Sequence, residues 1–483
     1  MIVCAILFLP LAAAVLCWIP GTGKRAATPV TFASSLALLV LTVKLAARII
    51  AVQKVVAVPN WIEVDSFGAL ILVLVAAVGF LACLYSLGYM PRTTHNLTIL
   101  HHYYGNFNLF IFSMAAVPVV ASPSLEWLAV EFTTLLSVLL VGFESNAEAL
   151  EAAWKYAILT LTGAAIALFG FLLLFWAMQK GGGSSYTWVG LAAVGAKMPP
   201  EVLKTAYLMI LVGFGAKVGL VPLHTWLPDA HSQAPTPICA LLSGVETTAV
   251  LYVILRLMPI MHPALGGAVE EWSLIFGLLS VGVAAFLLIQ VHDYKRLFAY
   301  STVEHMGIIL TAAGFGGVAA RYGAVYQILA HAATKSFCFF AAGAVLLVVG
   351  KRDIASVEGL MRRSPLAGSA LLVGALAIAG APPFVVFLGE FSILKAGISE
   401  AHYVAVGILA IFLVVAFFGI LWHVNRMVFS RSPVEAPVPE RKLIPLSCRL
   451  TLLLSFIPVI VLGVYVPPPV YELLRRAAAI IAG

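Results

Sequence analysis

Charged residues are scarce in this chain. Only 10% of its 483 residues are Asp, Glu, Lys or Arg, whereas 62% are hydrophobic. Soluble domains carry a charged fraction of about 25%, so the scarcity excludes an assembly of soluble domains. Apolar runs of about 20 residues follow one another with short connections. The sequence therefore predicts a polytopic membrane protein whose function lies within or beside the bilayer.

Clustered metal ligands and common catalytic motifs are also missing. The six cysteines form no C-x-x-C pair, and the chain has no G-x-S-x-G or H-E-x-x-H element. Lys and Arg are dispersed among short loops, so the net charge of +7 does not indicate nucleic-acid binding. We expect no metal and no redox cofactor in this chain. The run 1–20 lacks a basic leader, which favours a retained first helix over a cleaved signal peptide.

Apolar runs bounded by charge, glycine or proline predict an all-α protein with about fourteen transmembrane helices. We place them at 2–20, 28–50, 66–90, 106–122, 125–143, 153–178, 203–222, 236–258, 271–291, 297–316, 321–349, 366–398, 402–428 and 446–466. Lys and Arg are more frequent in the loops that follow odd-numbered helices. The positive-inside rule then predicts that both termini face outward.

Two of these helices contain prolines that free backbone carbonyls inside the bilayer. Pro222 interrupts the seventh predicted helix, and Pro382 and Pro383 interrupt the twelfth. If helices four to eight (106–260) and nine to thirteen (261–430) form two five-helix units, each break occupies the fourth place. Such matched breaks are typical of inverted-repeat transporters, although proline kinks also occur in ordinary packing. Residues 1–105 then carry helices one to three, and 431–483 carry helix fourteen and a tail.

The basic residues that fall inside predicted helices are all lysines. They are Lys44, Lys155, Lys217, Lys335 and Lys395. A desolvated lysine can give up its proton near neutral pH, whereas arginine stays charged, so the choice favours proton transfer. Lys44, Lys155 and Lys395 lie near enough to helix ends to reach the membrane surface, and that role is equally open for them.

Acidic residues also fall inside predicted helices, at Glu131, Glu246, Glu304 and Glu390. Buried charges in membranes face partners or water, so an internal polar path is indicated. We expect Glu131 to meet Lys217. At an effective dielectric of about 20, a pair 4 Å apart is worth about 4 kcal/mol, and separation to 7 Å leaves about 2.4. Such a motion would gate proton release, although a static pair that fixes helix register is the alternative.

Histidines supply further candidates for the path. His331 and Lys335 are four residues apart and share one helix face, and histidine titrates near neutrality. Glu304 and His305 lie early in the tenth helix, and His224, Asp229 and His231 follow the first break. These two groups either connect the path to the cytoplasm or simply face water. Glu390 is the better candidate for the path than Lys395, because five residues separate them and they point differently.

Several stretches together resemble the antiporter-like membrane subunits of complex I and its relatives. They read "KVGLVPLHTWLPDAHSQAPTPICALLSG", "DYKRLFAYSTVEHMG", "AHAATKSFCFFAAG", "GAPPFVVFLGEF" and "DSFGALILVLVAAVGFLACLYSLGYM". The match spans most of the chain. Two stretches look most similar to the F-type membrane component of energy-converting NiFe hydrogenases and formate hydrogenlyase-like complexes, namely "VEFTTLLSVLLVGFESNAEALEAAWKYAIL" and "STVEHMG".

The resemblance implies a fourteen-helix fold with inverted five-helix repeats and proton translocation coupled to electron transfer in partner subunits. It makes Glu131 and Lys217 the ion pair, Lys335 or His331 the eleventh-helix relay, and Glu390 the terminal group. One departure matters. Relatives carry a lysine in the eighth helix, within "SGVLLKTALY", where this chain reads "SGVETTAVLY" and has Thr248, with Glu246 as an added acid. The central relay then needs Glu246, His331 or water, or it is interrupted.

We therefore expect a non-catalytic, proton-translocating subunit of a respiratory or hydrogenase-type oxidoreductase in a prokaryotic inner membrane. Its partners would be other membrane-arm subunits and a peripheral redox module, either NiFe hydrogenase-like or quinone-reducing. Three alternatives stay open on the same scaffold: a sodium/proton antiporter subunit, an inorganic-carbon uptake module, and a structural membrane anchor that conducts no ions. Sequence alone does not identify the partner enzyme, the electron donor, the ion or its stoichiometry.

Overall fold

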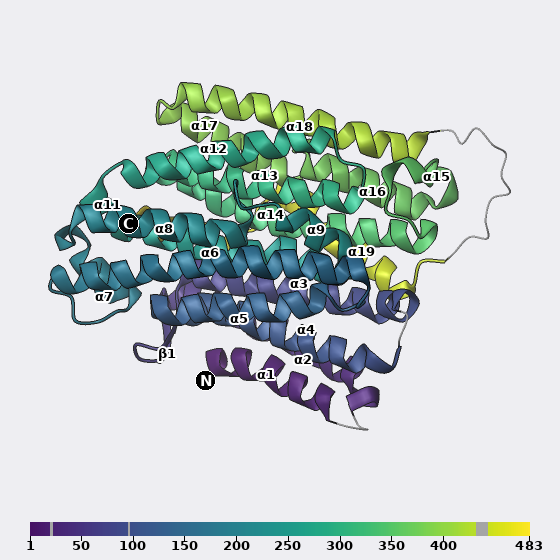
Figure 1. Cartoon of the computed structure of the whole chain (residues 1–483), viewed down its shortest axis with the longest axis horizontal. Helices are drawn as coiled ribbons and strands as arrows, with labels where there is room; N and C mark the ends of the chain where they lie inside the picture. Colours follow the sequence, from purple (N-terminus) through teal and green to yellow (C-terminus); the bar gives the residue numbers. More distant parts are fainter. Residues whose placement is uncertain (20–22, 95–96, 431–442) are drawn as a thin grey trace.

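A computed structural model describes residues 1–19, 23–94, 97–430 and 443–483. These residues form a bundle of helices whose axes mostly run in one direction, drawn horizontally in Figure 1. The helices are α1 (Ile2–Trp18), α2 (Gly23–Val52), α3 (Ser66–Thr93), α4 (Leu100–Ala116), α5 (Pro123–Val141), α6 (Ala147–Lys180), α7 (Trp188–Val194), α8 (Pro200–Val218), α9 (Trp226–Gln233), α10 (Thr236–Leu241), α11 (Thr247–Leu265), α12 (Ala268–Ile289), α13 (Tyr294–Gly314), α14 (Gly317–Val349), α15 (Leu360–Arg363), α16 (Pro365–Ile378), α17 (Val385–Ser399), α18 (Tyr403–Phe429), α19 (Leu446–Val464) and α20 (Pro468–Ala482). One antiparallel hairpin, β1 (Val55–Val58) with β2 (Ile62–Val64), precedes α3.

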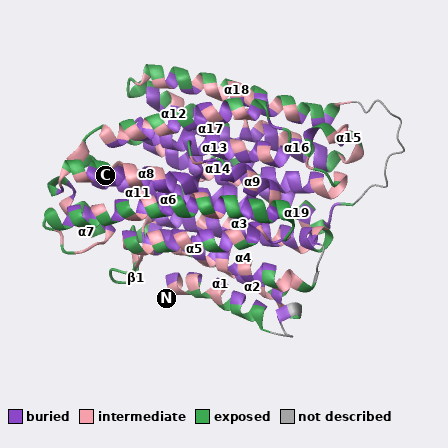
Figure 2. Cartoon of the chain, in the orientation of Figure 1, coloured by how far each residue is buried: buried purple, intermediate pink, exposed green. Residues whose placement is uncertain are grey.

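The bundle is that of a polytopic membrane protein. Among the described residues, nine helical segments are long and apolar enough to cross a membrane. Large apolar side chains such as Val404, Ile411, Phe418 and Trp422 stand exposed along α18. Figure 2 shows burial concentrated in the middle of the bundle and exposure along α18. Such an apolar exterior suits lipid, because a helix satisfies its own backbone hydrogen bonds there.

The predicted helices overlap observed ones, with ends that differ by up to seven residues, as where α11 ends at 265 and the prediction at 258. The twelfth predicted helix, 366–398, is two helices, α16 and α17. The eighth, 236–258, begins as α10, passes through a π-helical turn at Leu242–Glu246 and continues as α11 to Leu265. Residue 20, the predicted end of the first helix, and residues 431–442, where the predicted unit 431–483 begins, lie outside the described residues.

Both predicted breaks are loops between helices. α8 ends at Val218, and the next residue, Gly219, has a φ of 89°. α16 ends at Ile378, and Gly380 in the following loop has a φ of 76°. These left-handed conformations favour glycine, because a Cβ would strain them. Pro222 lies in the first loop, and Pro382 and Pro383 lie in the second, so each proline region ends one helix before the next begins.

The two ends of the bundle differ. Figure 1 shows α7, the β1–β2 hairpin and both chain termini at one end, which we call the α7 end, and α15 at the other. The last helix, α20, was not expected from the sequence. Its residues Tyr471 and Ile481 both contact the first turns of α14, at Tyr322 and Arg321, so α20 crosses α14 rather than running along it.

Candidate functional site

A buried ion pair lies between α8 and the π-helical turn. The Lys217 Nζ is 2.7 Å from the Glu246 Oε1, and both side chains are at most 3% exposed. The same amine donates a 2.5 Å hydrogen bond to the Tyr156 hydroxyl of α6. Lys217 belongs to the last turn of α8, directly before the first break, where helix C-termini favour cations. The first break therefore places the Lys217 ammonium at the C-terminus of α8, where the helix dipole favours a positive charge.

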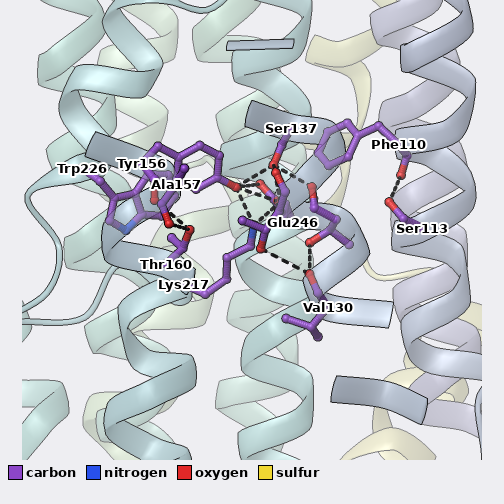
Figure 3. A network of polar contacts seen from close by, with 12 residues as sticks. Phe110, Ser113, Val130, Ser137, Tyr156, Ala157, Thr160, Lys217, Trp226 and Glu246 are labelled. Carbon is purple, nitrogen blue, oxygen red and sulfur yellow. Dashed lines mark hydrogen bonds and ion pairs between the residues drawn. The ribbon is translucent and has the colours of Figure 1, made fainter. Parts of the chain in front are cut away.

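Glu246 is held by hydroxyl groups from two other helices. Tyr156 donates to both carboxylate oxygens, at 3.1 and 3.3 Å, and the Ser137 Oγ of α5 donates at 3.1 Å. The Ser137 and Tyr156 oxygens are 2.6 Å apart. Figure 3 shows these groups converging on Glu246 and Trp226 beside Tyr156, where the two rings stack with centroids 4.2 Å apart. The carboxylate thus has an ammonium and two hydroxyl partners, which a buried charge requires.

The prediction that Glu131 is the ion-pair partner of Lys217 is wrong. Glu131 on α5 is only partly buried. Among the described residues, its side chain forms no hydrogen bond and no ion pair, and Lys217 instead contacts Glu246 and Tyr156. Glu131 does lie within electrostatic range of Lys217. The reason for the error is the π-helical turn, which places Glu246 against the end of α8. Glu246, the added acid of this sequence, is the residue that neutralises Lys217.

The π-helical turn also contacts the second half of the bundle. The Ser243 carbonyl accepts a 3.0 Å hydrogen bond from the His331 Nε2 of α14, and the Ser243 hydroxyl lies 2.6 Å from the Thr302 hydroxyl of α13. A π-helix shifts its hydrogen bonds and leaves carbonyls available to other donors. One turn of five residues thus carries Glu246, bonded to α8, and Ser243, bonded to α13 and α14.

His305 of α13 joins this contact to the second break. Its ring centroid is 5.2 Å from that of His331. The His305 Nε2 is 3.1 Å from the Ile378 carbonyl and therefore carries the proton, while the Nδ1 accepts from the Gln327 amide at 3.2 Å. Ile378 is the last residue of α16, so His305 satisfies a carbonyl that the break leaves without a helical partner.

Lys335 on α14 and Glu304 on α13 lie in the second predicted five-helix unit, 261–430. The Lys335 Nζ donates to the Phe298 carbonyl at 2.6 Å and contacts the Ser301 hydroxyl. Glu304, one turn further along α13, is buried and within electrostatic range of Lys335, and one of its oxygens has no hydrogen-bond partner. His331 and Lys335 do share one face of α14, as their spacing predicts.

Glu390 of α17 is 8% exposed and lies beside the second break. A Cβ built on Gly380 would come 2.1 Å from the Glu390 Oε2, so the glycine makes room for this carboxyl group. Glu304 is the ionisable group within electrostatic range of Glu390. Lys395, five residues later, is exposed, as are Lys44 and Lys155. Of the five lysines within predicted helices, only Lys217 and Lys335 are buried.

The remaining predicted site residues take different positions. The Thr248 hydroxyl bonds the Gly244 and Val245 carbonyls of its own helix, so it makes no contact with the ion pair. His224 is 8% exposed in the first break, and His231 on α9 is wholly buried. Sequence reasoning missed Tyr156, Ser137 and Ser243, because hydroxyl groups are common in apolar helices and only the packing reveals their role.

The described residues contain no group of three or more His, Cys, Asp or Glu side chains placed to hold a metal ion. What they contain is a series of protonatable and hydroxyl groups from helices of both halves. These are Glu131, Lys217, Tyr156, Glu246, Ser243, His331, His305, Lys335, Glu304 and Glu390. Such a series can pass protons between neighbours when water completes its gaps.

The chain matches known membrane proteins over most of its length. Residues 124–418 match the family described as NADH:quinone oxidoreductase/Mrp antiporter, and residues 54–96 match the family described as the N-terminus of chain 5 of NADH-ubiquinone oxidoreductase (complex I). A hydrogenase-4 component F homologue from Methylacidiphilum infernorum is 35% identical over 430 residues, which cover 86% of this chain and 88% of the relative.

Two solved structures have the same fold. A chain of the membrane-bound sulfane sulfur reductase, an archaeal respiratory membrane complex, superposes with a TM-score of 0.88 at 24% identity, covering 99% of this chain and 97% of the other. A chain of the Mrp complex from Dietzia sp. superposes with a TM-score of 0.86 at 18% identity, covering 100% and 97%. At these identities the likeness concerns the fold alone.

Proposed function

The chain belongs to the NADH:quinone oxidoreductase/Mrp antiporter family, and on that premise we propose that it moves protons across the membrane as one subunit of a larger redox complex. The path we propose begins at Glu131, passes the Lys217–Glu246 pair and the two histidines, and ends at Glu390. No redox cofactor is assigned to the chain, so the driving electron transfer would take place in a partner subunit. The observation that carries the proposal is the buried pair itself.

Burying an ammonium and a carboxylate in a membrane is expensive unless the two remain paired. The electrostatic energy of the Lys217–Glu246 pair therefore depends strongly on the distance between the two charges. At an effective dielectric of about 20, separating such charges from 4 to 7 Å removes about 1.8 kcal/mol. That is close to the roughly 2.3 kcal/mol that 100 mV supplies per charge. A movement of a few ångströms in α8 would suffice to release a proton from this site.

The π-helical turn supports a link between the two halves. Glu246 at its end responds to Lys217, and Ser243 near its start holds His331. A change in the ion pair that lets the turn relax to α-helical geometry would alter the hydrogen bond to His331. The relay therefore does not need an eighth-helix lysine, because this turn and its hydroxyl groups occupy the same region.

We also propose that the bundle contains fourteen membrane crossings arranged as the predicted units 1–105, 106–260, 261–430 and 431–483, with two inverted repeats in the middle. The two breaks support this arrangement. The first follows α8, which carries the buried Lys217, and the second follows α16 and lies beside the buried Glu390. Helices α8 and α13 are not among the nine segments of the described residues that are long and apolar enough to cross a membrane. Both carry buried ionisable groups, which lower their mean hydropathy. We place both termini on the outer side of a prokaryotic inner membrane.

The partners we propose are other membrane-arm subunits and a peripheral redox module of the NiFe hydrogenase or quinone-reducing type. The hydrogenase-4 component F homologue supports the former type. A sodium/proton exchanger is the second candidate, and the fold shared with a chain of an Mrp complex supports it. Dependence of transport on sodium in vesicles would separate the two, because proton pumping persists without sodium.

The proposal is tested by Lys217→Ala in the purified complex reconstituted into vesicles. Lys204→Ala is the matched control, because Lys204 is an exposed lysine on the same helix. Proton movement is followed with a trapped pH dye under an imposed membrane potential, and assembly is followed by co-purification of the partner subunits. We expect Lys217→Ala to abolish proton movement while the partners still co-purify. Normal proton movement in this variant would refute the proposal.

A further inference from the structure

A second buried acid lies near the α7 end of the bundle, apart from the path described above. Glu126, in the first turn of α5, is 0% exposed, although helix starts usually lie near the surface. Neither of its carboxyl oxygens has a hydrogen-bond partner. A buried carboxyl group without partners is costly, so native proteins place water or an ion beside such a group.

Surrounding segments explain why Glu126 is covered. The β1–β2 hairpin bonds the residues before α5, since the Ala121 amide donates to the Trp61 carbonyl at 3.0 Å. The Trp188 amide at the start of α7 donates to the Ala121 carbonyl at 3.1 Å. The hairpin and α7 thus form a cover over the start of α5.

Unpartnered donors lie around the same place. The Trp188 indole Nε1 and the Arg256 Nε are both buried and have no hydrogen-bond partner. Trp188 lies under the Arg256 guanidinium, 5.4 Å from the ring centroid, and Arg256 acts electrostatically on Glu126 without an ion pair between them. Buried donors on Trp188 and Arg256 without partners, together with a buried acid without partners in the field of Arg256, are groups that bridging water molecules satisfy.

A series of charged groups extends from the surroundings of Glu126 to the protein surface. Arg256 on α11 forms a 2.7 Å ion pair with Asp65, the N-cap of α3, and a 2.7 Å hydrogen bond to Tyr252. Beyond Asp65, the Lys54–Glu63 pair of the hairpin is 2.7 Å long, and the Lys54 side chain is 37% exposed. Because Arg256 is already neutralised by Asp65, Glu126 is the group whose charge is left uncompensated. Among the described residues, no group of three or more His, Cys, Asp or Glu side chains lies here to hold a metal ion, which leaves the proton as the exchangeable cation.

We propose that Glu126 is a proton-carrying group in a hydrated pocket formed by α5, α7 and α11, and that this pocket is a proton outlet of the first half, separate from Glu390. The inference rests on the proposed proton transport. Glu126 would receive its proton through water, because Glu131, five residues along α5, points to a different side of the helix, and Glu126 would be neutral at rest. Its O–H bond then breaks, the proton joins a water molecule as hydronium, and the carboxylate is transiently stabilised by Arg256. No electron transfer and no co-reactant is involved.

The test uses Glu126→Gln in the reconstituted complex, with Glu201→Gln as the matched control. Glu201 is an exposed acid in the first turn of α8. Proton flux is driven by a potassium diffusion potential and reported by a trapped pH dye. We expect proton flux in the Glu126 variant to be about tenfold slower, because an amide cannot release a proton to water as a carboxylic acid does, while water still bridges the pocket. The control should be unchanged. Unchanged flux in the Glu126 variant would overturn the outlet.

A second measurement protects the test against misfolding. The infrared carbonyl band of protonated carboxylic acids should lose one component in Glu126→Gln, and an unchanged band would show that Glu126 is not a proton carrier. Trp188→Phe keeps the ring and removes the indole N–H, so it should slow flux severalfold; flux equal to the wild type would contradict the bridged pocket. Lys217→Ala separates the two proposals. If it abolishes flux and Glu126→Gln does not, only the outlet fails.

Discussion

Lys217 and Glu246 lie on opposite sides of the first break, yet their charged atoms are 2.7 Å apart and both side chains are buried. The pair depends on two local features that are unusual in a membrane helix. α8 ends immediately after Lys217, and a π-helical turn ends at Glu246. Because each feature positions one charge, changes to the backbone at either place would reach the ion pair directly.

Glu246→Gln and Glu131→Gln should behave differently. The first leaves Lys217 buried beside an uncharged amide, and removing one partner of a buried pair costs about 3 to 5 kcal/mol. We expect lower thermal stability and no proton flux. Glu131→Gln removes only a distant electrostatic partner, so flux should fall while thermal stability stays close to that of the wild type. Melting curves in detergent and vesicle flux measure both; equal stability losses would contradict the assigned partner.

Tyr156→Phe should slow proton flux about tenfold, because the hydroxyl that accepts from Lys217 and donates to Glu246 is lost while the ring stacking on Trp226 remains. Tyr207→Phe is the control. Tyr207 is another buried tyrosine, whose hydroxyl lies 2.7 Å from that of Ser273. Tyr207→Phe removes one neutral hydrogen bond worth about 1 kcal/mol, whereas Tyr156→Phe removes hydrogen bonds to charged groups, worth about 1.5 to 3 kcal/mol each. Equal flux in the two variants would show that the Tyr156 hydroxyl has no role in transport.

The sequence was sufficient to predict most of the fold. Long apolar runs locate the helices, although their ends differ by up to seven residues (265 against 258 for α11), and the prolines at 222, 382 and 383 indicate where two helices stop. The hairpin, α7, α9, α15 and α20 were not expected, because such short elements lack a 20-residue apolar run. α20 in particular carries three charged residues, Glu472, Arg475 and Arg476, among apolar ones, and its packing against α3 and α14 places it.

The site was predicted less completely. Buried lysines and acids were identifiable because charge is rare in such helices, and Lys217, Lys335 and Glu390 are indeed buried. Which acid meets which base depends on the rotation of each helix, and the π-helical turn changes that rotation within one helix. It was the family resemblance that made Glu131, rather than Glu246, the partner of Lys217. The resemblance likewise points to Thr248 through its place in the motif, but its hydroxyl bonds its own helix.

His331→Gln should impair proton flux more than His305→Gln. Glutamine keeps a donor at either position but cannot accept and release a proton as imidazole does. His305 uses both ring nitrogens in hydrogen bonds, whereas the His331 Nδ1 has no partner. We expect about a hundredfold loss in the His331 variant and a loss of less than about fivefold in the His305 variant. Vesicle flux measures this, and the reverse order would show that His305 carries the proton.

Gly380→Ala should stop proton flux without changing any ionisable residue. The φ of 76° at Gly380 disfavours any other residue, and the new methyl group would come 2.1 Å from the Glu390 carboxyl group. Glu390 must then move away from the second break. Gly407→Ala on α18 is the control, because nothing lies within 4 Å of its added methyl group. Normal flux in Gly380→Ala would show that the position of Glu390 is not critical.

Asp65 should make the stability of the α7 end depend on pH. Burial by itself raises the pKa of Asp65, but the Arg256 guanidinium and the Gly68 amide outweigh it and hold that pKa below its ordinary value. A depressed pKa means that the stabilisation is complete above the unfolded pKa of about 3.9 and is lost as pH falls through the folded value. Asp65→Asn should therefore lower stability by about 3 kcal/mol at pH 7 and flatten the acid side of the profile.

Melting temperatures between pH 7 and pH 3 measure this dependence, and Asp353→Asn is the matched control. Asp353 also caps a helical turn, by accepting from the Ser356 amide at 2.9 Å. Unlike Asp65 it is exposed, and the described residues include no ion pair between Asp353 and an arginine. Its replacement should cost only a few tenths of a kcal/mol and leave the profile unchanged. If Asp65→Asn and Asp353→Asn gave the same profile, the ion pair with Arg256 would not be what stabilises the start of α3. In that case the field of Arg256 would also be free to act on Glu126 at rest, and the acid would no longer be expected to hold its proton there.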